Sequence, residues 1–148
     1  MSSRFTKGGC HCGNVRIEVT GEPIAAMHCH CVDCQKITGA AAVAVALFPP
    51  ANVNMTKGAP DTYTTLGESG EKIHRTFCGV YGSLIMGKPE AMPGFVTVML
   101  PALDDSSFIR KMVHIYTDHI KSWTVIPKDA QQFRKMPLWV KPVKGRDT

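Results

Sequence analysis

The chain has 148 residues, a length that suits one domain with a single core. Its composition, 44% hydrophobic and 20% charged, is typical of a folded globular protein and not of a disordered one. The longest apolar run, AAAVAVALF at 40–48, is too short to cross a bilayer as a helix, which takes about 20 residues. The opening MSSRFTKGG lacks the apolar segment of a secretion signal. We therefore expect a cytoplasmic protein with no membrane partner.

The net charge of +5 is unevenly spread. Residues 110–148 hold nine Lys and Arg against three Asp and Glu, so the rest of the chain is close to neutral. One interpretation is a solvated basic tail, and another is a site for an anionic partner. We favour the tail and do not expect nucleic acid as a partner.

Short strands between Gly and Pro turns predict a mainly β protein. The first, NVRIEVT at 14–20, alternates strictly and places Val15, Ile17 and Val19 on one face. The next, AAVAVALF at 41–48, reads as a buried strand, although its alanines leave a helix possible. Further strands are predicted at 61–69 and 72–78, which would form a hairpin, and at 82–87, 94–100 and 113–117.

Few helices are expected. The pattern KDAQQFRKM predicts a short C-terminal helix at 128–136, ended by Pro137, and a helical turn is expected near 33–39. We expect a single domain, 1–148, with its core in 5–138 and a frayed tail at 141–148. An exposed edge strand would make a homodimer reasonable.

Six cysteines stand out, and three of them fall in HCHCVDCQK at 28–36. Cysteines at i and i+2 are too close for a relaxed disulfide, and clustered cytosolic thiols more often bind metal. In an extended segment Cys29 and Cys31 point the same way, and a tight turn would bring Cys34 beside them. Three thiolates suit zinc, and the sequence nearby offers no fourth cysteine. An open fourth position is the mark of a catalytic zinc.

A second group comprises Cys10, Cys12 and the distant Cys78. A closed structural site would need a CxxC at 78–81, but the last position is Tyr81, a poor zinc ligand at neutral pH because its pKa lies near 10. The site could have three protein ligands, borrow a fourth from elsewhere, or hold no metal.

Simpler interpretations also apply. Free cysteines are often just buried, which is plausible for the second group and less so for the first. A Cys/His nucleophile is possible, but it would not need two further thiols. We expect the histidines to be structural, hydrogen-bonded or surface residues and not ligands: His11, His28, His30, His74, His114 and His119.

The motifs GGCHCGNVR, HCHCVDCQKITG, RTFCG and HIYTDHIKSW…FRKMP resemble the glutathione-dependent formaldehyde-activating (GFA) family, which includes centromere protein V. The resemblance runs from about residue 5 to 138. It implies a β-tent fold of small antiparallel sheets stapled by zinc.

The resemblance also implies roles for the cysteines. Cys29, Cys31 and Cys34 match the catalytic zinc ligands of the family. Cys10, Cys12 and Cys78 match three of its four structural ligands, and the fourth falls on Tyr81.

The activity for which the family is named joins formaldehyde to glutathione, and its reverse is a carbon–sulfur lyase reaction. Because glutathione carries two carboxylates, we expect basic residues at the site, with Arg16, Lys36 and Arg75 as candidates. The alternatives are a zinc enzyme with another small electrophile as substrate and a non-enzymatic zinc-binding module.

Overall fold

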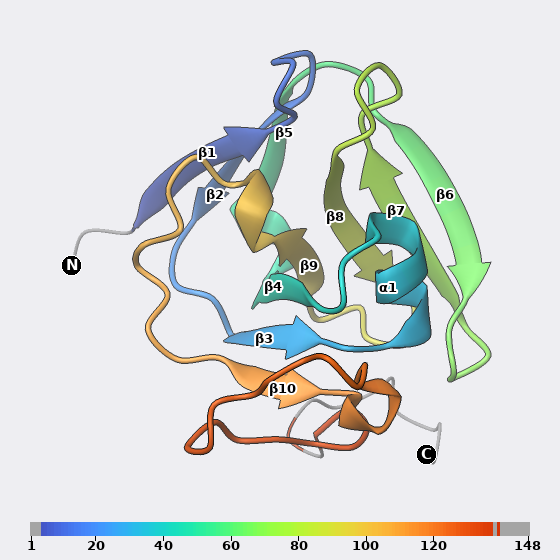
Figure 1. Ribbon diagram of the computed structural model, residues 1–148. Helices are drawn as coiled ribbons and strands as arrows, with labels where there is room; N and C mark the ends of the chain where they lie inside the picture. The colour runs from blue at the N-terminus through green and yellow to red at the C-terminus, as the bar shows by residue number, and fades with distance from the viewer. Residues whose placement is uncertain (1–3, 138, 140–148) are drawn as a thin grey trace.

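In the computed structural model, residues 4–137 and residue 139 are described, and they form a mainly β structure with two sheets and one short helix. The prediction of a mainly β fold is confirmed. Figure 1 shows β1, β2 and β5 on one side of the molecule, β6, β7 and β8 on the other, and β3 and β10 below them. The tail predicted to fray, 141–148, lies outside the described residues.

The three-stranded sheet has the order β1–β2–β5 and is antiparallel. Its strands are β1 (Phe5–Gly9), β2 (Arg16–Thr20) and β5 (Val53–Lys57). The alternation predicted for residues 14–20 is confirmed, because Val15, Ile17 and Val19 are all buried. This face of β2 therefore supplies one side of the core.

The seven-stranded sheet has the order β10–β3–β4–β9–β8–β7–β6. Its strands are β3 (Ala25–Cys29), β4 (Val43–Phe48), β6 (Asp61–Leu66), β7 (Lys72–Phe77), β8 (Leu84–Pro89), β9 (Val96–Met99) and β10 (Val113–Ile115). The hairpin predicted from 61–69 and 72–78 is β6 and β7. The sequence around 41–48 forms a strand and not the alternative helix.

One strand departs from the antiparallel expectation. β10 pairs with β3 in parallel, with His114 opposite His28. Parallel neighbours need a long connection, and here more than eighty residues separate the two strands. β10, the last strand in chain order, is thus the edge strand beside β3.

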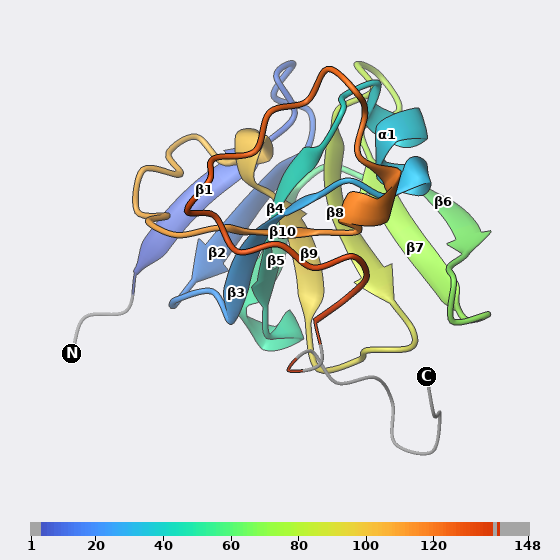
Figure 2. The same ribbon diagram turned by 60° about the horizontal axis from the view of Figure 1, so that its bottom comes forward.

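The predicted helix at 128–136 is wrong. Those residues run beside β10, where the His114 N–H donates to the Gln131 carbonyl (2.9 Å) and the Phe133 N–H donates to the His114 carbonyl (2.8 Å). Phe133 and Met136 also pack on the core. Pairing with β10 uses backbone groups that a helix would have bonded internally, so tertiary contacts override the local helical pattern. Figure 2 shows this segment passing in front of β10.

The one α-helix of the described residues is α1 (Val32–Thr38), where a helical turn was expected. The Cys31 sulfur caps its N-terminus by accepting from the Cys34 N–H (3.3 Å), and Gly39 ends it in the left-handed conformation with φ 75°. No helix in residues 4–137 has the length and apolar character needed to span a membrane.

β4 is buried on both faces, and this divides the core in two. Ala46 and Phe48 join a cluster that includes Ile17, whereas Val45 and Leu47 join a cluster on the other face. Side chains alternate along a strand, so a strand covered on both faces reads as continuously apolar. The two clusters each enclose part of one cysteine group, as described below.

Gln35 ties the α1 region to the segment after β10. Its amide nitrogen lies within hydrogen-bond distance of the carbonyls of His30 (2.9 Å), Ala41 (3.3 Å) and His119 (3.0 Å). Gln35 and His30 are buried, so the His30 carbonyl has little access to water in place of this amide.

We expect Gln35→Leu to lower the free energy of unfolding by about 1–3 kcal/mol, the cost of leaving a buried carbonyl unpaired. Urea denaturation would measure it, with Gln131→Leu, at an exposed glutamine, as the matched control. Equal stability of the two variants would contradict this account of Gln35.

Candidate metal centres

The first centre forms where β3 passes into α1. Cys29 is the last residue of β3, Cys31 caps α1 and Cys34 lies in the first turn of the helix. The three sulfur atoms lie within 4.8 Å of one another. The predicted convergence of Cys29 and Cys31 is confirmed, and the tight turn that brings in Cys34 is the first turn of α1.

The surroundings of these sulfurs favour a thiolate. Hydrogen bonds from Cys29 and Cys34, with a smaller contribution from the charge of Arg75, lower the pKa of Cys31 to about 3. The hydrogen bond to Cys31 raises the pKa of Cys29. These contacts favour the thiolate form of Cys31, which is the form of cysteine that binds metal.

Arg75 lies close enough to this centre for its charge to lower the pKa of Cys31, and it is only 7% exposed. Its guanidinium donates to the Thr65 hydroxyl (2.7 Å) and lies 3.9 Å from the Asp33 carboxylate. A buried guanidinium needs such partners, and they fix its position beside the sulfurs.

The donor set fits zinc. Three sulfurs within 4.8 Å of one another can share one ion at the usual Zn–S distance of about 2.3 Å, and thiolates are preferred zinc ligands. Among the described residues this group contains three donors, which is the number found in catalytic zinc sites.

The cysteines of the first centre line a pocket of about 390 Å³. Arg75, Lys72, Glu68 and Tyr116 also line it. This volume lies within the usual range for small-molecule sites, about 300–1,000 Å³. The centre is therefore next to a space that a small substrate could enter.

Tyr116 was not identified from the sequence. It has a left-handed backbone with φ 56°, the one positive φ at a non-glycine residue in the described part of the chain. Such strained residues often occur at functional sites. Burial raises the pKa of its hydroxyl to about 12, so the hydroxyl keeps its proton at neutral pH. The sequence HIYTD contains no signal for this conformation.

The second centre brings together cysteines from distant parts of the chain. The Cys12 sulfur lies 3.4 Å from that of Cys10 and 3.6 Å from that of Cys78. Tetrahedral ligands on zinc stand about 3.8 Å apart, so these sulfurs also fit the ion. Cys10 and Cys78 are buried and Cys12 is exposed.

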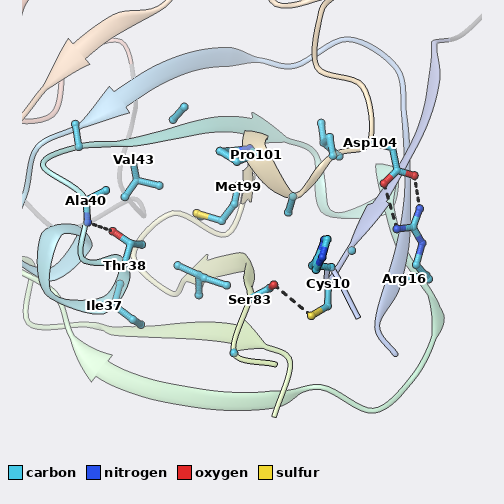
Figure 3. A pocket seen from close by; sticks show the side chains of 18 residues that line it. Cys10, Arg16, Ile37, Thr38, Ala40, Val43, Ser83, Met99, Pro101 and Asp104 are labelled. Atoms are coloured by element: carbon cyan, nitrogen blue, oxygen red, sulfur yellow. Dashed lines mark hydrogen bonds and ion pairs between the residues drawn. The ribbon is translucent and has the colours of Figure 1, made fainter. Parts of the chain in front are cut away.

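Tyr81 does not complete the second centre. Its side chain is 60% exposed, and its ring packs on that of His11 with centroids 5.4 Å apart. The metal-ligand group among the described residues holds three donors here as well. Figure 3 shows the Cys10 sulfur directed at the Ser83 hydroxyl (3.2 Å) in the wall of a larger pocket of about 620 Å³.

The three basic residues proposed from the sequence fall in different places. Arg75 lines the pocket of the first centre. Arg16 is paired with Asp104 in the wall of the larger pocket (Figure 3). Lys36 is exposed on α1 and is absent from the lining of both pockets. The two pockets share Val43, Leu84 and Met99, so these side chains form a common wall.

The histidines near the first centre pack together away from the sulfurs. His30 Nε2 lies 2.9 Å from His114 Nδ1, and the rings of His28 and His114 stack with centroids 4.7 Å apart. His30 and His114 are buried. None of the three belongs to either group of possible metal ligands found among the described residues.

We expect about two zinc ions per chain in protein purified without added metal, because both cysteine groups have suitable spacing. Cys31→Ser and Cys78→Ser should each lower the content to about one, measured by elemental analysis. A content near one in the unmutated protein, unchanged by Cys78→Ser, would show that the second centre does not hold zinc.

Comparison with known proteins supports the resemblance seen in the sequence. A search of curated proteins finds no match to this chain. Among solved structures, the chain is similar to the crystal structure of a Rhodobacter sphaeroides protein from a structural genomics programme. The two have 21% sequence identity and a TM-score of 0.55, and the match covers 86% of this chain and 98% of the other; at this identity it shows the fold alone. The profile of the family described as glutathione-dependent formaldehyde-activating enzyme matches residues 5–119, and the chain belongs to this GFA family.

Proposed function

We propose that this protein is a zinc-dependent enzyme of the carbon–sulfur lyase type. It would act on a glutathione–formaldehyde adduct or on the adduct of a related small thiol. The observation that carries the proposal is that Cys29, Cys31 and Cys34 lie together in the wall of a pocket of small-molecule size. Membership of the GFA family supports this reaction class.

The reaction is the addition of a thiol to an aldehyde and its reverse. A sulfur–carbon bond forms, the C=O double bond becomes a single bond, and the proton of the thiol ends on the oxygen. In the reverse direction the sulfur–carbon bond breaks and the proton returns to sulfur. When bound, zinc supplies a Lewis acid and an open coordination position.

The residues of the chain would bind and orient the reactants. Cys29, Cys31 and Cys34 would hold the ion, and three thiolates on Zn²⁺ would give the centre a net charge of −1. Arg75 offsets this charge from a buried position. Holding two reactants side by side supplies much of the acceleration that an addition of this kind needs.

Tyr116 is the proposed hydrogen-bond donor to the aldehyde oxygen. It lines the same pocket, and its raised pKa keeps the hydroxyl protonated. Negative charge develops on the oxygen as sulfur attacks, so a fixed neutral donor stabilises the transition state more than the ground state.

The free cysteines also bear on the cellular compartment of the protein. Six free cysteines suit a reducing compartment, so we propose a cytoplasmic protein with a small thiol as its partner. Two alternatives are kept as outcomes of the tests: a zinc enzyme with a different electrophile, and a zinc-binding module without activity.

We expect Cys31→Ser to reduce the exchange of formaldehyde with its thiol adduct to the uncatalysed rate, because the metal centre loses a ligand. Two-dimensional exchange NMR on glutathione and formaldehyde, repeated with other thiols, would measure it. Exchange at the unmutated rate in a variant that has lost this zinc would refute metal catalysis. No acceleration by the unmutated protein with any thiol and aldehyde would favour one of the alternatives.

Tyr116→Phe should lower the catalysed rate about 100-fold, the usual effect of removing one donor to a developing oxyanion. Zinc content and folding should not change. Tyr63→Phe is the matched control, because Tyr63 is an exposed tyrosine on β6. Equal rates in the two variants would remove Tyr116 from the mechanism.

A further inference from the structure

The pocket at Cys29, Cys31 and Cys34 is mostly apolar. The sheet supplies its floor through β3, β4, β9 and β10, and the β8–β9 connection closes one side. The apolar side chains that form these surfaces include Met27, Val45, Leu47, Phe95, Met99 and Ile115. All of them are buried members of one core cluster, so the pocket is an opening into the hydrophobic core.

The charged residues of the pocket do not give it a basic character. Asp33, Glu68, Lys72 and Arg75 line it, two acidic and two basic, so their charges cancel. Arg75 lies 3.9 Å from Asp33, and Glu68 lies 3.5 Å from Lys135 outside the pocket. Among the described residues that line this pocket, Lys72 is the basic side chain with no carboxylate partner.

This lining is a poor match for glutathione. Glutathione has two carboxylates and one ammonium group, and each must find a partner when it leaves water. The pocket offers one unpaired cation and a large apolar surface. Of the three basic residues expected from the sequence at a glutathione site, only Arg75 lines this pocket, and it is paired with Asp33.

The methionines of the pocket suggest that it can accept ligands of different shapes. Met27, Met92, Met99 and Met136 all line the pocket. Methionine is unbranched and polarizable, so it adapts to apolar groups of different outline. A lining of this kind suits a class of compounds better than one rigid ligand.

We infer that the thiol or thiol adduct that binds at this centre carries an uncharged apolar arm, aliphatic or aromatic, which lies on Met92, Phe95 and Met99. The inference rests on the proposed function, because the sulfur of the substrate is taken to bind at the cysteine centre. Burying the arm removes apolar surface from water and directs the sulfur toward the open position.

Thiol binding to the Co²⁺-loaded protein tests the inference without relying on activity. Thiolate coordination changes the sulfur-to-cobalt charge-transfer and d–d absorption, and the spectrum of Cys31→Ser gives the contribution of the second centre for subtraction. The probes are benzyl mercaptan as the apolar thiol, glutathione as the large polar thiol, and 2-mercaptoethanol as the small polar one. We expect benzyl mercaptan to bind at least about tenfold more tightly than either polar thiol, because even one methylene in an apolar pocket is worth about tenfold.

A charge placed in the pocket should reverse this preference. Met92 lines the pocket and is partly exposed, so Met92→Lys adds a cation with little cost to folding. It should weaken benzyl mercaptan and strengthen glutathione, each by about tenfold. Met55→Lys adds the same charge at an exposed methionine of β5, which is absent from the lining of this pocket, and should change neither affinity.

The binding results distinguish a failure of the apolar-arm inference from a failure of the proposed enzymatic function. If glutathione binds as tightly as benzyl mercaptan or more tightly, the apolar arm is wrong and the proposed enzyme stands. If benzyl mercaptan binds but Met92→Lys has no more effect than Met55→Lys, the arm does not lie in this pocket and the inference is also wrong. If no thiol alters the spectrum of the first centre, the proposed function fails together with the inference.

Discussion

The structure depends on the burial of β4 on both faces. One face of this strand packs with β2 and β8 in the cluster that contains Cys10 and Cys78. The other face packs with β3 and β10 in the cluster that contains Cys29. A sheet covered on both sides forces each cysteine group to form on its own face, and so the two candidate centres are separated by a layer of backbone.

The three cysteines of the first centre come together because the chain changes from strand to helix between Cys29 and Cys34. The extended end of β3 points Cys29 and Cys31 the same way, and the first turn of α1 returns Cys34 to them. The Cys31 sulfur also accepts the N–H of Cys34, so the candidate ligand is at the same time the cap of the helix. Loss of Cys31 would therefore affect both the metal site and the helix, and for this reason zinc content and rate have to be measured together.

The sequence predicted what depends on local pattern. The alternation of β2, the hairpin of β6 and β7, and the spacing of both cysteine groups all follow from side-chain period and turn residues. It did not predict β1, β3 or β5, which are short and contain glycine, alanine or exposed polar residues, so their pairing is decided by neighbours distant in the chain. The helix expected at 128–136 fails for the same reason, since its backbone is bonded to β10.

Of the candidate basic residues, Arg75 lies at the first centre and Arg16 does not, because their positions are set by sheet order. Tyr116 could not have been found from local pattern, since the feature that distinguishes it is its left-handed backbone conformation.

The wall that the two pockets share limits how the protein can be changed. Val43, Leu84 and Met99 each face both spaces, so a smaller residue at any of them enlarges two cavities at once. Selectivity toward one ligand cannot be adjusted there without altering the neighbouring space. Substitutions at Met92 or Phe95 would change the smaller pocket without changing the larger one, because these residues line only the smaller pocket.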